Sequence, residues 1–516
     1  MGRPQEFELK LECDPNKADD LKRHLAGVRS GNSHTEAITS VYFDTDDKKL
    51  SAAGVSLRVR SLGGRRIQTI KTLQPGQLFA RAEWEQEIKG PWPDLGLAKG
   101  TALEPLSKQD LAELLRPVFE SRVQRTVQVV HENGSQIEVA LDQGVIDTGQ
   151  NSSLLCELEL ELKEGNPEGL FRLARELSGS VPLQLAVISK PERGYALLDG
   201  TEYRSEKSSD LEIPQTAPVE QAFKIIARSC LRQLLANRPA MLARKPEALH
   251  QMRIGLRRLR TAISIFKDVV ADSQQEHIKK ELKWITRELA PARELDVLNG
   301  EVIGSLQDVV PHSRDLAEAR TEVEVRRQQA YDDASRAVRS QRFARAVLDT
   351  AEWIEIGAWA SRDDPMLRLR RERSIESHAA AELARRRNRI RKRGRHLRKL
   401  ADEQRHRLRI RAKKLRYGIE FFTSVFPGKK NEERRGAALA ALRDLQTGLG
   451  GLNDIAMREK LMSEMGHVSG NEAHASRVPF VAGVIYGSQQ ARTDDLLRGA
   501  EKAHEKFSLV KAFWKI

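Results

Sequence analysis

Charged residues at every second position are the first feature of this chain that could do chemistry. They recur in short segments of the first two hundred residues: Glu6, Glu8 and Lys10; Arg58 and Arg60; Arg81, Glu83 and Glu85; Glu138 and Asp142; Glu157, Glu159 and Glu161. Because alternate side chains of a β-strand share one face, each segment would present its charges together. Clustered carboxylates favour Mg²⁺ or Mn²⁺, and lysine and arginine bind phosphate oxygens. This pattern predicts a site for a divalent metal and a highly charged phosphate.

The alternation leaves two arrangements of these strands open. If the charged faces point outward, the sheet is merely solvated, whereas strands that close into a barrel with those faces inward would enclose a charged cavity. The chain has no GxxxxGK[ST] loop, so a P-loop mechanism has no support in the sequence. Phosphoryl transfer in a cavity would instead depend on positioning and charge neutralisation.

A second set of basic residues repeats at helical spacing. Residues 250–266 align without gaps with residues 406–422, and seven of the seventeen positions are identical. One side of each predicted helix carries the residues that we call the basic ridge: His250, Arg253, Arg257 and Arg260, and then His406, Arg409, Lys413 and Arg416. A solvated cationic face is the usual explanation for one such helix. Two matched ridges without interleaved acids would repel each other unless an anion bridged them, which predicts polyanion binding.

The elements that must position these residues divide the chain near residue 210. Alternating segments before it predict antiparallel strands, and apolar residues at intervals of three and four after it predict helices. Residues 1–200 contain 25 basic and 30 acidic side chains, whereas residues 201–516 contain 62 and 43, so the net charges are −5 and +19. We predict a β-rich domain over residues 1–205, a linker over 206–217 and a domain of two related helical bundles over 218–510.

Composition narrows the class of protein. The 516 residues are 40% hydrophobic and 31% charged, which suits folded, soluble domains. No apolar run reaches the length of roughly 18 residues that a membrane span requires, and the first ten residues, with two glutamates among them, are too acidic for a secretory signal. The three cysteines are far apart in sequence and form no CxxC motif. These features predict a cytoplasmic protein that does not contact a membrane.

Several segments resemble known families. The ExExK start at Glu6 to Lys10 resembles the signature of the CYTH superfamily, the triphosphate tunnel metalloenzymes. The chain also resembles later segments of this family, in the same order, at residues 42–45, 57–60, 81–85, 140–144, 156–159 and 189–195. The duplicated His–Arg helices resemble the CHAD domain, a conserved-histidine α-helical domain. The order of the two halves resembles that of bacterial CYTH–CHAD inorganic triphosphatases.

The CYTH resemblance implies a fold and a set of site residues. The fold would be α+β followed by all-α: an eight-stranded antiparallel β tunnel barrel, with the charged faces inward, and then the helical bundles. The implied catalytic residues are Glu6, Glu8, Lys10, Glu83 and Glu85. The implied ligands of Mg²⁺ or Mn²⁺ are Glu6, Glu8, Glu157 and Glu159, supported by Asp142. The implied triphosphate-binding residues are Lys10, Arg58, Arg60, Lys71, Arg81, Arg125, Lys190 and Arg193.

The CHAD resemblance implies that the basic ridge binds inorganic polyphosphate, and it extends the expected location to polyphosphate granules. The run from Arg385 to Arg398 could extend this surface or contact nucleic acid, which is the less favoured partner. The leading hypothesis is a metal-dependent inorganic triphosphatase joined to a polyphosphate-binding module. The alternatives are nucleoside or thiamine triphosphate hydrolysis, adenylate cyclase activity, and a scaffold that binds polyanions without catalysis. The sequence gives no prediction of oligomeric state.

Overall fold

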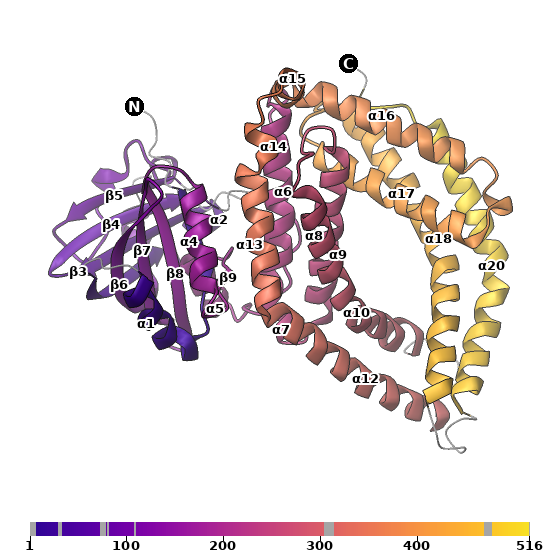
Figure 1. Cartoon of the computed structure of the whole chain (residues 1–516), viewed down its shortest axis with the longest axis horizontal. Coiled ribbons are helices and arrows are strands. Elements are labelled where there is room, and N and C mark those ends of the chain that lie inside the picture. The colour runs from indigo at the N-terminus through magenta and orange to yellow at the C-terminus, as the bar shows by residue number, and fades with distance from the viewer. Residues whose placement is uncertain are drawn as a thin grey trace.

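The chain folds into a β-rich half and a helical half (Figure 1). The structure is a computed structural model that describes residues 7–28, 33–72, 79, 82–107, 110–303, 314–468 and 477–514. The predicted class, α+β followed by all-α, is confirmed.

One antiparallel sheet makes up most of the N-terminal half. Its strand order is β5-β4-β3-β2-β6-β7-β8-β1-β9. The strands are β1 (Phe7–Glu12), β2 (His34–Asp44), β3 (Val55–Leu62), β4 (Arg65–Thr72), β5 (Glu83–Ile88), β6 (Arg116–Glu132), β7 (Ser135–Asp147), β8 (Ser152–Glu164) and β9 (Gln184–Leu185). The described residues therefore form nine strands rather than the expected eight, because the two-residue β9 pairs with the end of β1.

The two ends of the sheet approach each other. The backbone N–H of Glu8 in β1 donates to the carbonyl of Phe79, close to the start of β5, at 2.9 Å. The rings of Phe7 and Phe79 stack beside this bond with their centroids 5.7 Å apart. This contact brings β1 next to the β5 edge and encloses the inner face of the sheet.

Burial of the opposite face explains why the charges point inward. Leu9 and Leu11 of β1, and Leu158 and Leu160 of β8, are at most 1% exposed and belong to the main hydrophobic core. That core continues into two helices that lie on the outer face of the sheet, α1 (Ala18–Val28) and α4 (Glu168–Ser178). Since neighbouring residues of a strand face opposite ways, the charged residues between these leucines must face the interior.

Three short helices complete this half. They are α2 (Lys49–Ala52), α3 (Leu111–Leu114) and α5 (Lys190–Leu198). Helix α5 begins with a capping box, in which the Ser189 hydroxyl accepts from the Glu192 backbone and the Glu192 carboxylate accepts from the Ser189 backbone. Such a cap satisfies amide groups that a helix start otherwise leaves unpaired, so it fixes where the helix begins.

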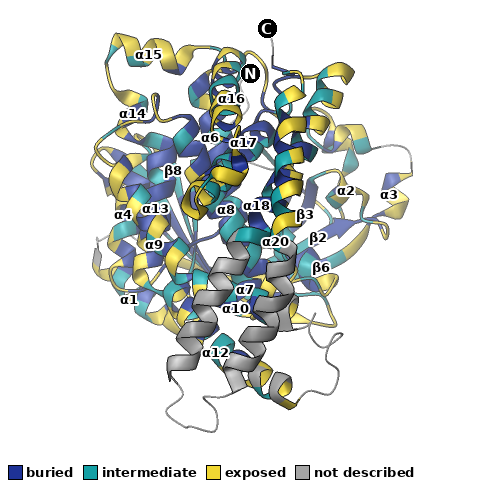
Figure 2. Cartoon of the chain, turned by 90° about the vertical axis from the view of Figure 1, so that its right-hand side faces the viewer, coloured by how far each residue is buried: buried dark blue, intermediate teal, exposed yellow. Residues whose placement is uncertain are grey.

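The C-terminal half consists of packed helices whose buried sides meet and whose exposed sides face outward (Figure 2). They are α6 (Val219–Ala236), α7 (Arg238–Leu242), α8 (Pro246–Ile265), α9 (Gln275–Glu288), α10 (Ala290–Val297), α12 (Arg314–Arg339), α13 (Gln341–Ile356), α14 (Ala358–Ser361), α15 (Pro365–Glu372), α16 (Ile375–Arg393), α17 (Asp402–Phe421), α18 (Lys429–Val468) and α20 (Arg477–Leu509).

The two copies of the sequence repeat form helices α8 and α17, which pack against each other. Arg258 of α8 lies 3.4 Å from Glu420 of α17, and its guanidinium lies over the Phe421 ring. Helix α8 also packs closely on α6, because a Cβ atom at Gly255 would lie only 2.9 Å from the backbone nitrogen of Leu234. The repeat therefore places related helices at the centre of the helical half.

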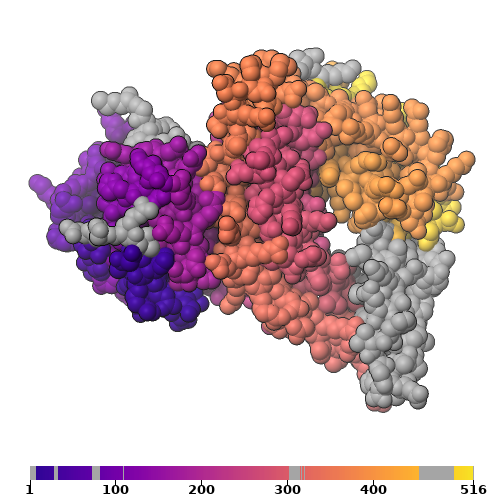
Figure 3. Space-filling view, in the orientation of Figure 1, coloured from indigo at the N-terminus to yellow at the C-terminus, as the bar shows by residue number. Residues whose placement is uncertain are grey.

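The two halves share one continuous hydrophobic core and several ion pairs. Arg175 of α4 lies 2.8 Å from Asp349 of α13, and Arg238 of α7 lies 2.8 Å from Glu12 of β1. The space-filling view shows the indigo-to-purple half against the helices coloured orange (Figure 3). Within the predicted linker, Ile213 is buried and bonds to Ser424. This segment is therefore packed along the helical half.

Among the described residues, no helix has the length and the apolar character of a membrane-crossing segment. All three cysteines are free and buried.

Candidate functional site

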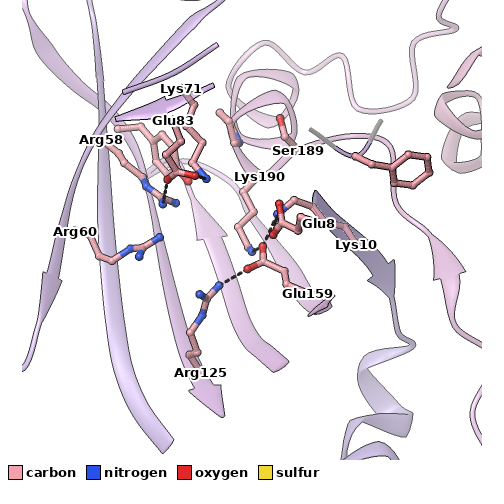
Figure 4. A pocket seen from close by; sticks show the side chains of 13 residues that line it. Glu8, Lys10, Arg58, Arg60, Lys71, Glu83, Arg125, Glu159, Ser189 and Lys190 are labelled. Carbon is pink, nitrogen blue, oxygen red and sulfur yellow. Dashed lines mark hydrogen bonds and ion pairs between the residues drawn. The ribbon is translucent and has the colours of Figure 1, made fainter. Parts of the chain in front are cut away.

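The inner face of the sheet forms a charged pocket with α5 at one side (Figure 4). The pocket is partly open to solvent, and its empty space is about 690 Å³ when the part that opens to solvent is included. Its lining includes six cations and three carboxylates, which gives a formal charge of +3. The cations are Lys10, Arg58, Arg60, Lys71, Arg125 and Lys190, and the carboxylates are Glu8, Glu83 and Glu159. Tyr42, Phe79, Ser189 and Pro191 complete the lining.

Glu159 is the centre of the pocket wall formed by β1, β6 and β8. It accepts hydrogen bonds from Lys10, Arg125 and Lys190, each at 2.6 Å. Burial disfavours the ionised carboxyl, but Lys10, Lys190 and Arg125 outweigh it and hold the pKa of Glu159 well below its usual range. This carboxylate therefore stays ionised and fixes three cations in place.

Lys190 extends the same network behind the pocket wall. Its ammonium lies 2.8 Å from Asp142 and 2.6 Å from Glu157, whose side chains are both 1% exposed. Burial alone would lower the pKa of Lys190, but Asp142, Glu157 and Glu159 raise it well above its usual value. Burial is also the main cause of the raised pKa of Glu157. The lysine is thus the counter-charge for three buried carboxylates.

Arg58, Arg60 and Lys71 form the facing wall, on β3 and β4. Lys71 lies 2.5 Å from Glu83, whereas Arg58 lies 3.7 Å from Glu83 and Arg60 lies 4.0 Å from Glu85. The buried Nε atoms of Arg58 and Arg60 have no hydrogen-bond partner in the part of the chain that is described. This wall therefore has unused hydrogen-bond donors and an excess of positive charge.

Repulsion between the cations appears in their pKa values. Arg58, then burial and Arg125, lower the pKa of Arg60 to about 10. Burial and Arg58 lower the pKa of Lys71 below its usual value. A bound anion would relieve this repulsion, because it favours the charged form of each group.

Tyr42 lines the pocket and was not predicted as a site residue. It lies opposite Arg58 in the pairing of β2 with β3, and its hydroxyl is buried without a hydrogen-bond partner among the described residues. The sequence signal was the segment Tyr42 to Thr45, which resembled the family without indicating a role for the phenol.

Other predicted residues lie elsewhere. Arg193 points away from the pocket and donates to the carbonyl of Leu154 at 2.8 Å. Glu161 faces Lys163 at 2.7 Å, outside the pocket lining. Glu85 sits at the pocket edge, where the Thr69 hydroxyl donates to it at 2.9 Å. The residues Glu6 and Arg81 lie outside the described part of the chain.

The acidic residues are chemically suitable as metal ligands, but those in the described part of the chain are not arranged as a preformed metal site. Across the described residues, no group of three or more His, Cys, Asp or Glu side chains has the arrangement of a metal site. Ammonium groups lie among the carboxylates instead, as where Lys10 contacts Glu8 at 2.8 Å and Glu159 at 2.6 Å. Carboxylate oxygens are nevertheless the donors that Mg²⁺ and Mn²⁺ prefer.

The helical half holds the lysine-bearing end of α5 in position. Arg232 of α6 donates to Glu192 at 2.7 Å, and it also donates to the carbonyl of Val187. The other oxygen of Glu192 accepts from Ser189 in the capping box, next to Lys190. A side chain of the helical half thus supports a cation of the pocket.

The first copy of the basic ridge lies beside α9 and α10. Arg253 donates to the carbonyl of Thr286 at 3.1 Å. Burial and Arg293 lower the pKa of His250 to about 4, so its imidazole is neutral at pH 7. Burial and Arg257 lower the pKa of Arg253 to about 10. Within the described chain the buried Nε of Arg257 has no hydrogen-bond partner.

The second copy of the ridge lies on α17. Arg416 is 2.9 Å from Glu420 and lies over the Tyr417 ring. A Cβ atom at Gly450 of α18 would lie 3.2 Å from the Arg409 guanidinium, so this side of α17 faces α18. His406 is exposed, and Lys413 is partly buried.

Comparison with known families agrees with this division of the chain. Residues 4–195 match the CYTH domain, and residues 225–463 match the CHAD domain. The chain therefore contains a CYTH domain followed by a CHAD domain.

Individual relatives match one or other part of the chain. An inorganic triphosphatase of Haemophilus influenzae is 30% identical over 195 residues, which are 37% of this chain and 55% of that protein. The chain thus spans about half the length of this relative. The CHAD domain of Ricinus communis is 26% identical with a TM-score of 0.50, over 58% of this chain and 96% of the other.

A Hippeastrum protein described as an adenylyl cyclase with dominant triphosphatase activity is 16% identical to this chain. The similarity has a TM-score of 0.30 and covers 37% of this chain and 95% of the other, so it supports no argument.

Replacing Lys190 with methionine should strongly destabilise the protein, because three carboxylates would lose their shared counter-charge. We expect the unfolding free energy at neutral pH to fall by about 3–5 kcal/mol, as when one partner of a buried ion pair is removed. Without the lysine, burial should raise the pKa of these carboxyls in the folded variant, so their ionised forms destabilise the fold. The loss of unfolding free energy should therefore shrink as the pH falls from about 8 to about 5 and the carboxyls become protonated. Urea unfolding followed by circular dichroism would measure both effects.

Lys163→Met is the matched control, since this lysine is 38% exposed and pairs with the partly exposed carboxylates of Glu138 and Glu161. It should cost less than about 1 kcal/mol. Equal deficits for the two variants would contradict the role given to Lys190.

Proposed function

We propose that the pocket hydrolyses inorganic triphosphate to pyrophosphate and orthophosphate. The observation that carries this proposal is the excess of cations in a partly open pocket, where the Nε groups of Arg58 and Arg60 are buried without a hydrogen-bond partner among the described residues. A compact polyanion is the ligand that such a pocket suits best. The CYTH match, and the triphosphatase named among the relatives, support the same substrate.

The two walls of the pocket would share the work of binding. Arg58, Arg60 and Lys71 would hold phosphate oxygens on one side, and Lys10 and Lys190 on the other. Water then adds to the terminal phosphorus as the bond to the bridging oxygen breaks. The cations stabilise the charge that collects on the departing pyrophosphate.

The acidic residues would have two tasks. Glu159 orders the cations that touch the substrate, as its three hydrogen bonds indicate. Glu8, Glu157 and Glu159, together with the predicted ligand Glu6, would hold Mg²⁺ or Mn²⁺, with Asp142 in support. When bound, a divalent ion neutralises phosphate charge and polarises the phosphorus–oxygen bond.

Glu8→Gln should reduce triphosphate hydrolysis by about 100-fold, the usual cost of removing one electrostatic contact from an active site. The measurement is phosphate release by the full chain from triphosphate, ATP and thiamine triphosphate, each with Mg²⁺ or Mn²⁺. We expect triphosphate to be the preferred substrate.

Glu161→Gln is the control, because Glu161 pairs with Glu8 across the β1–β8 ladder but lies outside the pocket. It should retain activity. Equal turnover of all three substrates would contradict the substrate assignment, and no turnover would indicate a scaffold.

Catalytic efficiency should fall at alkaline pH because two pocket cations have lowered pKa values. As the pH rises toward 10, Lys71 and Arg60 lose their charge earlier than ordinary lysine and arginine do. The quantity to measure is kcat/KM, which reports ionisation of the free enzyme. Lys71→Arg should move the fall to higher pH, since arginine keeps its charge.

Lys17→Arg provides the comparison, because the Lys17 side chain is 56% exposed and far from the pocket lining. Comparing variants at each pH cancels the ionisation of the substrate. If Lys71→Arg and the unmodified protein had identical pH profiles, the assignment of Lys71 to the binding site would be wrong.

We further infer that the basic ridge binds inorganic polyphosphate. The observations that favour this are the CHAD match, the paired ridge helices, and the unpartnered Nε of Arg257. Arginine and lysine along one helix side would follow a chain of phosphates.

Arg257→Glu combined with Lys413→Glu should weaken polyphosphate binding by at least about tenfold in moderate salt, because two contacts become repulsive. Fluorescence anisotropy with labelled long-chain polyphosphate would measure the affinity, and thermal melting would verify folding. Unchanged affinity with unchanged salt dependence would refute the ridge assignment.

A further inference from the structure

A second group of cations lies between α16 and α17, apart from the basic ridge. We call it the α16–α17 face, and it consists of Arg386, Arg389, Arg393, Arg411 and Lys414, next to the ridge residue Arg260 of α8. Arg260, Arg389 and Arg393 are exposed, and the others are partly buried. Neither the proposed hydrolysis nor the basic ridge accounts for this group as a whole.

Helical geometry gathers these residues on facing sides of two helices. Arg386, Arg389 and Arg393 are three and four residues apart, so they share one side of α16 at intervals of about 4.5 and 6 Å. Arg411 and Lys414 likewise share one side of α17. The sequence contains no acidic residue between positions 383 and 400, or between 404 and 419.

Arg386 connects α16 to the end of α8. The Arg386 guanidinium donates to the carbonyl of Ser264 at 2.9 Å, and Glu382 lies 3.2 Å from it. Of the face residues, Arg386 is the one whose charge has an acidic partner, because the remaining four form no ion pair within the described chain. Apart from Arg386, the face therefore concentrates positive charge that has no acidic partner among the described residues.

Helix α17 packs against both α16 and α8, which brings these cations close enough to repel one another. Burial, then Arg386 and Arg260, lower the pKa of Lys414. Burial, then Arg393 and Arg389, lower the pKa of Arg411. Charges from three helices thus act on one another, as expected for a single surface rather than scattered side chains.

The face and the ridge occupy different sides of α17. At about 100° per residue, Arg411 and Lys414 are centred about 150° away from Arg409 and Lys413. The ridge side meets α18 at Gly450, whereas the other side meets α16. One extended ligand on the ridge would therefore leave the α16–α17 face accessible.

We propose that the α16–α17 face is a second binding site for a linear phosphate polymer and that it acts independently of the basic ridge. Four of its five cations are arginines, whose planar guanidinium binds phosphate through two hydrogen bonds. Rows of cations on two helices can follow consecutive phosphates of one strand. Inorganic polyphosphate and single-stranded RNA both supply this chemistry.

The test uses the full chain in which the ridge has been reversed by Arg257→Glu and Lys413→Glu. Labelled long-chain polyphosphate and a labelled single-stranded RNA should still bind, with an affinity that falls as salt rises. Adding Arg389→Glu, Arg393→Glu and Arg411→Glu should lower the remaining affinity for one or both polymers by at least about tenfold, and should reduce the salt slope by about 2. The polymer whose binding is lost identifies the source of the phosphate.

A charge-matched control separates this effect from net charge. Arg314→Glu, Arg336→Glu and Arg345→Glu change the charge by the same amount on α12 and α13, at side chains that are 86%, 68% and 73% exposed. Should the glutamate variant of the face unfold on thermal melting, glutamine at the same three positions should give a smaller loss of the same kind. Equal effects from face and control variants, or no residual binding of either polymer to the ridge variant, would overturn the proposal.

Discussion

Compensation of charge in a confined space is the constraint on which the rest of the structure depends. Asp142 and Glu157 are almost fully buried, and they are tolerated because the ammonium of Lys190 lies within 2.8 Å of both. That ammonium must come from the first residue of α5, so the start of this helix has to be fixed. The capping box at Ser189 and Glu192 fixes it. The charge balance of the pocket therefore depends on where helix α5 begins.

Much of the fold followed from the sequence, but the direction of the charged faces did not. Alternation placed Glu8 and Lys10 on one side of a strand and Leu9 on the other, which is equally compatible with an outward or an inward charge. The structure resolves this through α4, more than 150 residues away, whose apolar side belongs to the same core as Leu9 and places the Phe171 ring 6.4 Å from that of Phe7. Periodicity along one strand carries no information about such a distant helix. The resemblance to the tunnel family supplied what the periodicity lacked.

The predicted site shows the same limit at the level of single residues. Lys10, Arg58, Lys71 and Lys190 line one pocket, because strand parity and helix position determine where such side chains point. Tyr42 was missed, since an aromatic residue in a β-strand is usually explained by the core. No sequence pattern could have joined Arg232 to Glu192, forty residues away in the other half of the chain. Contacts between domains depend on docking, which local spacing does not encode.

The contact of Arg232 with Glu192 has a consequence for how such a chain can evolve. A recombination event that exchanged the helical half for an unrelated partner would remove the guanidinium that holds this carboxylate and the carbonyl of Val187. It would also strip the outer side of α4 of Asp349, the partner of Arg175. The β-rich half thus depends on contacts with the helical half, and the coding regions of the two halves should be inherited together.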